Sequence, residues 1–236
     1  MTSIGERLQA LHTRIHDAEI RAGRLPGSVQ LLAVSKAHTA DSIRAAFSAG
    51  QIRFGENYLQ EALDKQLALQ DLPIEWHFIG PIQSNKTQPI AHHFDWVHSV
   101  DRIKIAQRLA VARGDQLSPL NVCLQLNVSA EASKSGVDAD GLIELATLVS
   151  HLPQLRLRGI MAIPAPTKDE AQQRAQFHRV RESFEQLKDK GFALDTLSMG
   201  MSDDFPAAIA EGANIIRVGS AIFGARPSVA NTVNQH

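Results

Sequence analysis

The sequence predicts an α/β fold, a single (β/α)8 barrel of the TIM type. Short apolar segments of strand-like composition alternate with segments of helical period, and eight such pairs fit within 236 residues, close to the roughly 250 residues typical of this barrel. No Pro/Ser-rich linker, low-complexity tract or long repeat divides the chain. We therefore expect one domain over residues 1–236, with an N-terminal helix within 1–25 and a flexible tail at 227–236.

The main alternative is an open, doubly wound parallel sheet, which also alternates strands and helices. The dinucleotide-binding version of that fold carries a GxGxxG motif after its first strand. No such motif follows the first apolar run here, so the closed barrel is favoured.

The first elements carry clear signals. Ser3 and Glu6 form a capping-box pattern ahead of a helix whose apolar residues recur every three or four positions. A Pro-Gly break at 26–27 precedes the first strand, and Gly50 stands where a helix ends. The expected strands cover residues 31–35, 52–57, 75–80, 94–100, 120–128, 155–163, 194–200 and 214–220. Between them we expect helices at about 43–47, 58–69, 86–93, from Asp101 onward, at 142–151, across 177–187, and in a short segment ending near Gly212.

Composition excludes several functional classes. The chain is 44% hydrophobic and 21% charged, with a formal net charge of -1, so it has no basic footprint for nucleic acid. No apolar stretch approaches the roughly 18 residues of a membrane helix, and the N-terminus lacks a signal-peptide pattern. We expect a cytoplasmic protein that binds neither nucleic acid nor membranes. The single cysteine, Cys123, is expected to be a small buried residue, a reactive thiol being the alternative.

The ends of the expected strands mark a candidate site, because active groups of such barrels lie at the carboxyl ends of the strands. Strand one ends in Ser35 and Lys36, strand two in Glu56 and Asn57, and strand five in Asn127. Strands seven and eight run into residues 198–204 and 217–224, where this fold commonly binds phosphate.

Both late loops combine a glycine with a serine at the start of a new helix. Gly200 stands near Ser202, and Gly219 precedes Ser220. A glycine permits close backbone approach, and a hydroxyl donates to an anion. Either loop alone is also explained as a glycine turn with a serine cap, but the two together, at these positions, predict a phosphate site.

Lys36 ends the first strand on the side of Leu32 and Val34, which are expected to face the barrel interior. A lysine there projects into the mouth of the barrel, where burial lowers its pKa and makes its amine a nucleophile able to form a Schiff base with a carbonyl. The alternative is a lysine whose amine reaches into solvent. A lysine facing a phosphate cup indicates a phosphorylated aldehyde, either a phosphosugar or pyridoxal 5′-phosphate.

Long segments of the chain decide between these ligands through a family resemblance. The strings "LLAVSK", "FGENYLQEALDK", "WHFIGPIQSNK", "SKSGV", "RLRGIMAIPAP" and "LSMGMSDDFPAAIAEGANIIRVGSAIFGAR" occur in this order. Over residues 28–226 the chain resembles the YggS/PROSC family, the pyridoxal phosphate homeostasis proteins of vitamin B6 metabolism. The resemblance implies a barrel similar to the N-terminal domain of alanine racemase, with pyridoxal 5′-phosphate (PLP) as cofactor.

The resemblance also implies roles for six residues. The residue matching the family's aldimine lysine is Lys36, and Arg217 would face the pyridine nitrogen. The full set implied to bind the cofactor is Lys36, Asn57, Ser202, Arg217, Gly219 and Ser220. His38, two residues after the lysine, is assigned no role.

The residues further favour a cofactor carrier over an enzyme. Racemisation by two bases needs a second proton carrier, which in the racemase that the fold resembles is a tyrosine of a separate domain. Tyr58 is the only tyrosine of this chain. If Arg217 faces the pyridine nitrogen, as the resemblance implies, the ring remains neutral and is a poor electron sink. We therefore expect no catalytic residues, and a function in buffering PLP and delivering it to apo-enzymes. The alternative is a PLP-dependent racemase or decarboxylase that recruits another acid, such as His77.

Other polar residues predict less. His12 and His16 lack a carboxylate or cysteine partner at ligand spacing, so no metal site is expected. Lys134, in the loop after strand five, is a candidate for transient acceptance of the aldehyde, the alternative being a solvated loop lysine. A monomer is expected.

Overall fold

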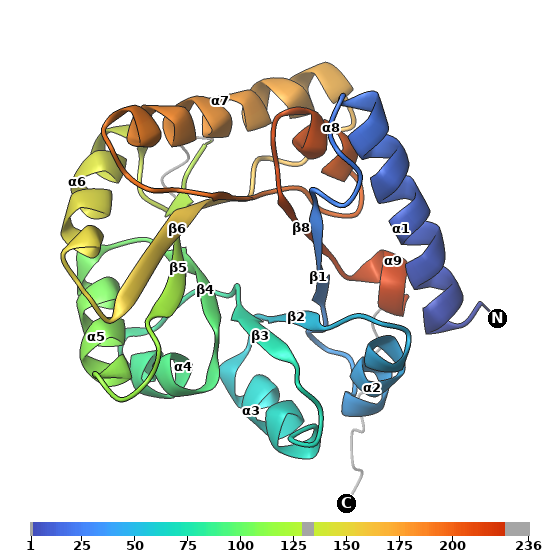
Figure 1. The fold of residues 1–236 in the computed structure, drawn as a ribbon, viewed down its shortest axis with the longest axis horizontal. Coiled ribbons are helices and arrows are strands. Elements are labelled where there is room, and N and C mark those ends of the chain that lie inside the picture. The colour runs from blue at the N-terminus through green and yellow to red at the C-terminus, as the bar shows by residue number, and fades with distance from the viewer. Residues whose placement is uncertain (1, 129–134, 225–236) are drawn as a thin grey trace, which may run out of the picture.

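A computed structural model describes residues 2–128 and 135–224. Its strands close into one parallel barrel in the order of the sequence, with β1 paired to β8, as Figure 1 shows. The strands are β1 (Gln30–Val34), β2 (Arg53–Glu56), β3 (Glu75–Phe78), β4 (Trp96–Val100), β5 (Leu120–Leu126), β6 (Leu155–Ala162), β7 (Thr196–Ser198) and β8 (Ile215–Val218). This confirms the predicted closed barrel and excludes the open sheet.

Helices surround the barrel, one or more after each strand (Figure 1). They are α1 (Ile4–Arg21), α2 (Ala40–Ser48), α3 (Leu59–Ala68), η1 (Ser84–Lys86), α4 (Thr87–His93), α5 (Ile103–Arg113), α6 (Ala139–Ser150), α7 (Glu170–Asp189), α8 (Phe205–Ala210) and α9 (Ser220–Phe223). None of the helices within the described ranges is long and apolar enough to span a lipid bilayer.

The caps explain where several helices begin and end. In α1 the predicted capping box is present, with the Ser3 hydroxyl accepting from the Glu6 amide and the Glu6 carboxylate accepting from the Ser3 amide. Gly50 adopts φ 96° just after α2, as expected of a terminating glycine. The expectation that Asp101 opens α5 was wrong, because Arg102 is the N-cap and Asp101 pairs with its guanidinium at 2.6 Å.

The hydrophobic core lies mainly between the strands and the helices. Side chains on the outer face of the sheet, such as Ala33, Phe54 and Phe78, are buried against helical residues such as Ile43 and other apolar side chains of that layer. Burial of this layer is the main favourable term for the fold.

The interior of the barrel is different, because much of it is polar. A small separate cluster of Trp96, Cys123 and Met161 lies apart from the main core, and beside it two fully buried histidines come from β3 and β4. Cys123 is fully buried, as predicted, and burial raises the pKa of its thiol to about 12. The expected tail at 227–236 lies outside the described residues.

Candidate functional site

A cavity of about 420 Å³ opens at the carboxyl ends of the strands. Its volume lies in the range of small-molecule sites, roughly 300–1,000 Å³. Other hollows of similar volume lie between outer helices, one between α1, α7 and α8 and one between α4 and α5. The first cavity is lined by residues that follow β1, β2, β3, β6, β7 and β8, where this fold carries out chemistry, so the mouth of the barrel is the candidate site.

All six residues expected to bind a cofactor line this cavity. The lining residues are Val34, Lys36, His38, Asn57, Ile79, Ile163, Met201, Ser202, Arg217, Gly219, Ser220 and Gly224. Segments from opposite ends of the sequence meet here, because β1 pairs with β8 and places Leu32 opposite Arg217.

Lys36 lies two residues beyond the end of β1 and is half-buried. Val34 lines the same cavity, which agrees with the alternation expected along the strand. Ser35, between them, is fully buried on the other side and donates its hydroxyl to Glu56 at 2.6 Å. Lys36 therefore points toward the cavity while its neighbour anchors the backbone.

A buried ion cluster holds the end of β1 in place. The Lys65 ammonium of α3 donates to the Ser35 carbonyl at 2.8 Å, to Glu56 at 2.7 Å and to Glu61 at 2.5 Å. Glu61 also accepts the amide of Ala37 at 2.6 Å, and Ala37 has a positive φ of 61°. Burial raises the pKa of the Glu56 carboxyl despite the nearby ammonium. The backbone on both sides of Lys36 is thus fixed by this cluster.

The two predicted phosphate loops converge. The hydroxyls of Ser202 and Ser220 lie 3.2 Å apart, although they follow different strands. A Cβ on Gly219 would lie 2.9 Å from the Val34 carbonyl oxygen, and Gly200 adopts φ 95° with Ala208 close behind it. Gly219 is therefore required for its loop to approach β1 this closely, and Gly200 for its turn to pack against α8.

Arg217 of β8 supplies a fixed positive charge to the cavity wall. It is 4% exposed, and it donates to the Ser198 carbonyl at 2.6 Å, to the Ser198 hydroxyl at 2.8 Å and to the Ala162 carbonyl at 2.9 Å. Burial lowers the pKa of its guanidinium to about 10, so the side chain remains charged at neutral pH.

Asn57 lines the cavity, and its side chain carries a buried acceptor. Among the described residues its Oδ1 finds no hydrogen-bond partner, although buried polar atoms normally have one. A Cβ on Gly80 would lie 2.2 Å from the Asn57 carbonyl oxygen. The absent side chain at Gly80 thus lets the two loops pack against one another.

Several cavity residues were not anticipated from the sequence. Ile79 and Ile163 follow the ends of β3 and β6, a position that could have been found by extending the strand-end rule to every strand. His38 also lines the cavity and stacks on Phe223, with ring centroids 4.9 Å apart.

Other sequence candidates lie elsewhere. Tyr58 is 58% exposed and does not line the cavity. His77 is fully buried inside the barrel, also away from the cavity lining. His12 and His16 are exposed, and within residues 2–128 and 135–224 no group of three or more possible ligands is arranged for a metal. Lys134 lies outside the described residues.

Comparison with known proteins places the chain in a family. The family model for the alanine racemase N-terminal domain matches residues 7–227. A protein of Pseudomonas aeruginosa named pyridoxal phosphate homeostasis protein is 60% identical over 226 residues, which cover 96% of this chain and 97% of that protein. The chain belongs to the pyridoxal phosphate homeostasis protein family. Its fold and the resemblance inferred from the sequence are thereby confirmed.

Solved structures agree with this membership in the homeostasis protein family. PipY of Synechococcus elongatus, solved with PLP bound, is 41% identical, with a TM-score of 0.83, and the match covers 94% of this chain and 100% of that one. Alanine racemase from Corynebacterium glutamicum is 17% identical with a TM-score of 0.68, and the match covers 94% of this chain and 63% of that one. This last likeness shows a shared fold.

Proposed function

We propose that the cavity at the mouth of the barrel binds pyridoxal 5′-phosphate reversibly, with Lys36 holding the aldehyde. The observation that carries the proposal is that Lys36, the Ser202–Ser220 hydroxyl pair and Arg217 face one cavity. A relative with 41% identity was solved with PLP bound, which supports the same ligand here.

The groups in the cavity fit the parts of this ligand. The two hydroxyls and the backbone at Gly219 can donate to a phosphate. Arg217 can donate to the pyridine nitrogen, and the unsatisfied Oδ1 of Asn57 accepts from a donor beside the ring. The apolar side chains of Val34, Ile79, Ile163 and Met201 line the same space.

Lys36 supplies the covalent bond in this proposal. Its neutral amine adds to the aldehyde carbon, a carbon–nitrogen double bond forms, and the aldehyde oxygen leaves as water. Addition of water reverses the step and releases the aldehyde. No oxidant or other reactant is needed, so the protein can take up and release its ligand repeatedly.

The same site is poorly equipped for turnover of amino acids. A guanidinium cannot accept a proton, so a ring nitrogen facing Arg217 remains unprotonated and withdraws electrons weakly. Tyr58 is outside the cavity, and among the described lining residues His38 is the sole imidazole and Lys36 the sole amine. We infer a carrier that buffers PLP in the cytoplasm as a monomer and delivers it to apo-enzymes.

Trapping tests the covalent assignment. The purified protein is incubated with PLP, reduced with borohydride, digested and analysed by mass spectrometry. The pyridoxyl group should lie on Lys36, and Lys36→Ala should lose the chromophore. Label on another lysine would refute the assignment, and a sugar phosphate imine without a chromophore would favour an aldolase.

An exchange assay tests the absence of turnover. The loaded protein is incubated with amino acids in D2O, and loss of the α-proton is followed by NMR. We expect stoichiometric binding without catalytic exchange. Rapid exchange that disappears in both Lys36→Ala and His38→Gln would instead identify a two-base racemase.

A further inference from the structure

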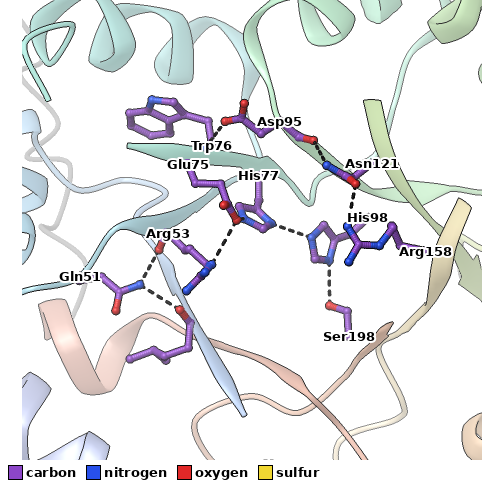
Figure 2. Close-up of polar contacts among 11 residues, drawn as sticks. Gln51, Arg53, Glu75, Trp76, His77, Asp95, His98, Asn121, Arg158 and Ser198 are labelled. Carbon is purple, nitrogen blue, oxygen red and sulfur yellow. Dashed lines mark hydrogen bonds and ion pairs between the residues drawn. The ribbon is translucent and has the colours of Figure 1, made fainter. Parts of the chain in front are cut away.

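Two buried histidines inside the barrel take no part in the cavity. His77 of β3 and His98 of β4 are fully buried, and Figure 2 shows them side by side between Glu75 and Ser198. Histidines are costly to bury without partners, so their contacts indicate what they do.

These histidines complete a chain of hydrogen bonds that begins at the cavity. Arg217 Nη1 lies 2.8 Å from Ser198 Oγ, which lies 2.8 Å from His98 Nδ1. His98 Nε2 lies 2.9 Å from His77 Nδ1, and His77 Nε2 lies 2.8 Å from Glu75 Oε1. Glu75 is the first residue of β3, at the amino end of the barrel. The chain therefore crosses the barrel from one end to the other.

The chemistry of its two ends fixes the direction of every bond. A guanidinium only donates, so the Ser198 hydroxyl accepts from Arg217. With both rings neutral and the Glu75 carboxylate accepting from His77, His98 Nδ1 is an acceptor, and Ser198 donates its own proton to it. His98 then carries its proton on Nε2 and donates to His77 Nδ1. His77 likewise carries its proton on Nε2 and donates to Glu75, whose carboxylate only accepts. Aligned bonds of this kind strengthen one another.

The surroundings keep both rings neutral. Burial lowers the pKa of His77, against the opposing effects of Glu75 and Asp95 and with a smaller contribution from Arg53. Burial also lowers the pKa of His98 far below its usual value, assisted by His77 and Arg217. These are the charged and titratable groups that face the two rings.

Packing fixes the ring of His77 as well. It stacks on Trp96 with centroids 5.5 Å apart and planes 8° apart. Two neutral rings, each protonated on Nε2, satisfy the arrangement of protons that Arg217 and Glu75 require at the two ends of the chain.

We propose that Ser198, His98, His77 and Glu75 are positioning residues that hold Arg217 in the orientation needed at the cofactor ring. The proposal rests on the proposed function, because it assigns these residues to the Arg217 end of the PLP site. Its consequence is that Glu75, a partly exposed carboxylate at the far end of the barrel, affects binding of PLP at the mouth.

Histidine NMR tests the chain in the protein without PLP. Both His77 and His98 should show the nitrogen shifts of a neutral ring protonated on Nε2, unchanged between pH 8 and pH 6. Glu75→Met removes the last acceptor and should change the tautomer signals of His77. Protonation on Nδ1, or a charged ring at pH 7, overturns the proposal. This measurement does not depend on whether PLP binds, so it fails separately from the proposed function.

PLP binding tests the effect on Arg217. Ser198→Ala removes the hydroxyl that links Arg217 to His98, whereas Ser198→Thr keeps one. We expect Ser198→Ala to raise the Kd for PLP at least fivefold and to shift the absorption maximum of the bound chromophore, and Ser198→Thr to restore both. Glu75→Met, at a partly exposed position, should also raise the Kd, by a smaller factor. It provides the test of the chain if Ser198→Ala does not fold. Unchanged Kd and absorption in every folded variant that breaks the chain overturn the proposal.

Discussion

Replacement of Lys65 by methionine tests the ion cluster behind Lys36. The Lys65 and Glu56 side chains are 7% and 0% exposed, and their charged atoms lie 2.7 Å apart. Methionine keeps much of the apolar stem but removes the ammonium. Glu56 then retains the Ser35 hydroxyl as its donor, too little to hold a buried carboxylate ionised. We therefore expect the variant to fold with Glu56 protonated.

The loss of folding stability caused by Lys65→Met depends on the pH at which folding is measured. Protonating a carboxyl whose unfolded pKa is about 4.3 costs about 1.36 kcal/mol per pH unit above that value. The expected loss is thus about 3.7 kcal/mol at pH 7 and about 1 kcal/mol at pH 5. These values are upper limits for the contribution of Glu56 alone, because burial already raises the pKa of Glu56 in the native protein.

The sign of the pH dependence is fixed by the same reasoning. The folded pKa of Glu56 in the variant lies above the unfolded one, so its contribution to stability is fully present below the unfolded pKa and is lost as pH rises toward the folded pKa. The difference in stability between native protein and variant should therefore widen from pH 5 to pH 7.

Urea denaturation at pH 5, 6 and 7 measures the difference. Lys104→Met, on the exposed surface of α5, is the matched control and should change stability by less than about 0.5 kcal/mol. Adding Glu56→Gln to Lys65→Met should flatten the pH dependence. A loss that is equal at pH 5 and pH 7, or below about 1 kcal/mol at pH 7, would show that the cluster does not act as described.

Three further outcomes follow from the structure. Ser202→Ala with Ser220→Ala should weaken PLP binding at least tenfold, because a hydrogen bond to a charged group contributes about 1.5–3 kcal/mol, while binding of pyridoxal without its phosphate stays unchanged; equal loss for both ligands in titrations would contradict the phosphate assignment. Gly219→Ala places a Cβ 2.9 Å from the Val34 carbonyl, so spectroscopic titration should show weaker PLP binding, and unaltered affinity would mean that β1 yields freely. Cys123, with its thiol pKa raised to about 12 by burial, should react with a thiol reagent only as fast as the protein unfolds; fast labelling of native protein would show an open path to it.

The sequence predicts the fold and the place of Lys36 well, for identifiable reasons. Most strands are short apolar runs, and several of the neighbouring helices have a side-chain cap or a terminating glycine, as at Ser3 and Gly50. Alternation along β1 puts Lys36 on the side of Val34 without further information. The approach of Ser202 and Ser220 follows from the neighbouring positions of β7 and β8 in a closed barrel.

Contacts between elements could not be predicted in the same way. In the sequence Lys65 looks like any exposed lysine of a helix, because its burial depends on how α3 is rotated over β1 and β2. Likewise, alternation places His77 and His98 inside the barrel, but their meeting at 2.9 Å depends on the stagger between strands. Such stagger is set by the packing of the whole barrel rather than by any local pattern.

Pairing of the first strand with the last has a consequence for biosynthesis. Lys36 is made early and Arg217, Gly219 and Ser220 are made late, and β1 and β8 bring them together only when the cylinder shuts. A polypeptide still growing on the ribosome, before β8 is synthesised, lacks the residues that β8 and the loop after it contribute to the cavity. Under the proposed function, a ligand that contacts both sets of residues binds only after β8 has paired with β1, and its binding then stabilises the folded protein by RT ln(1 + [L]/Kd).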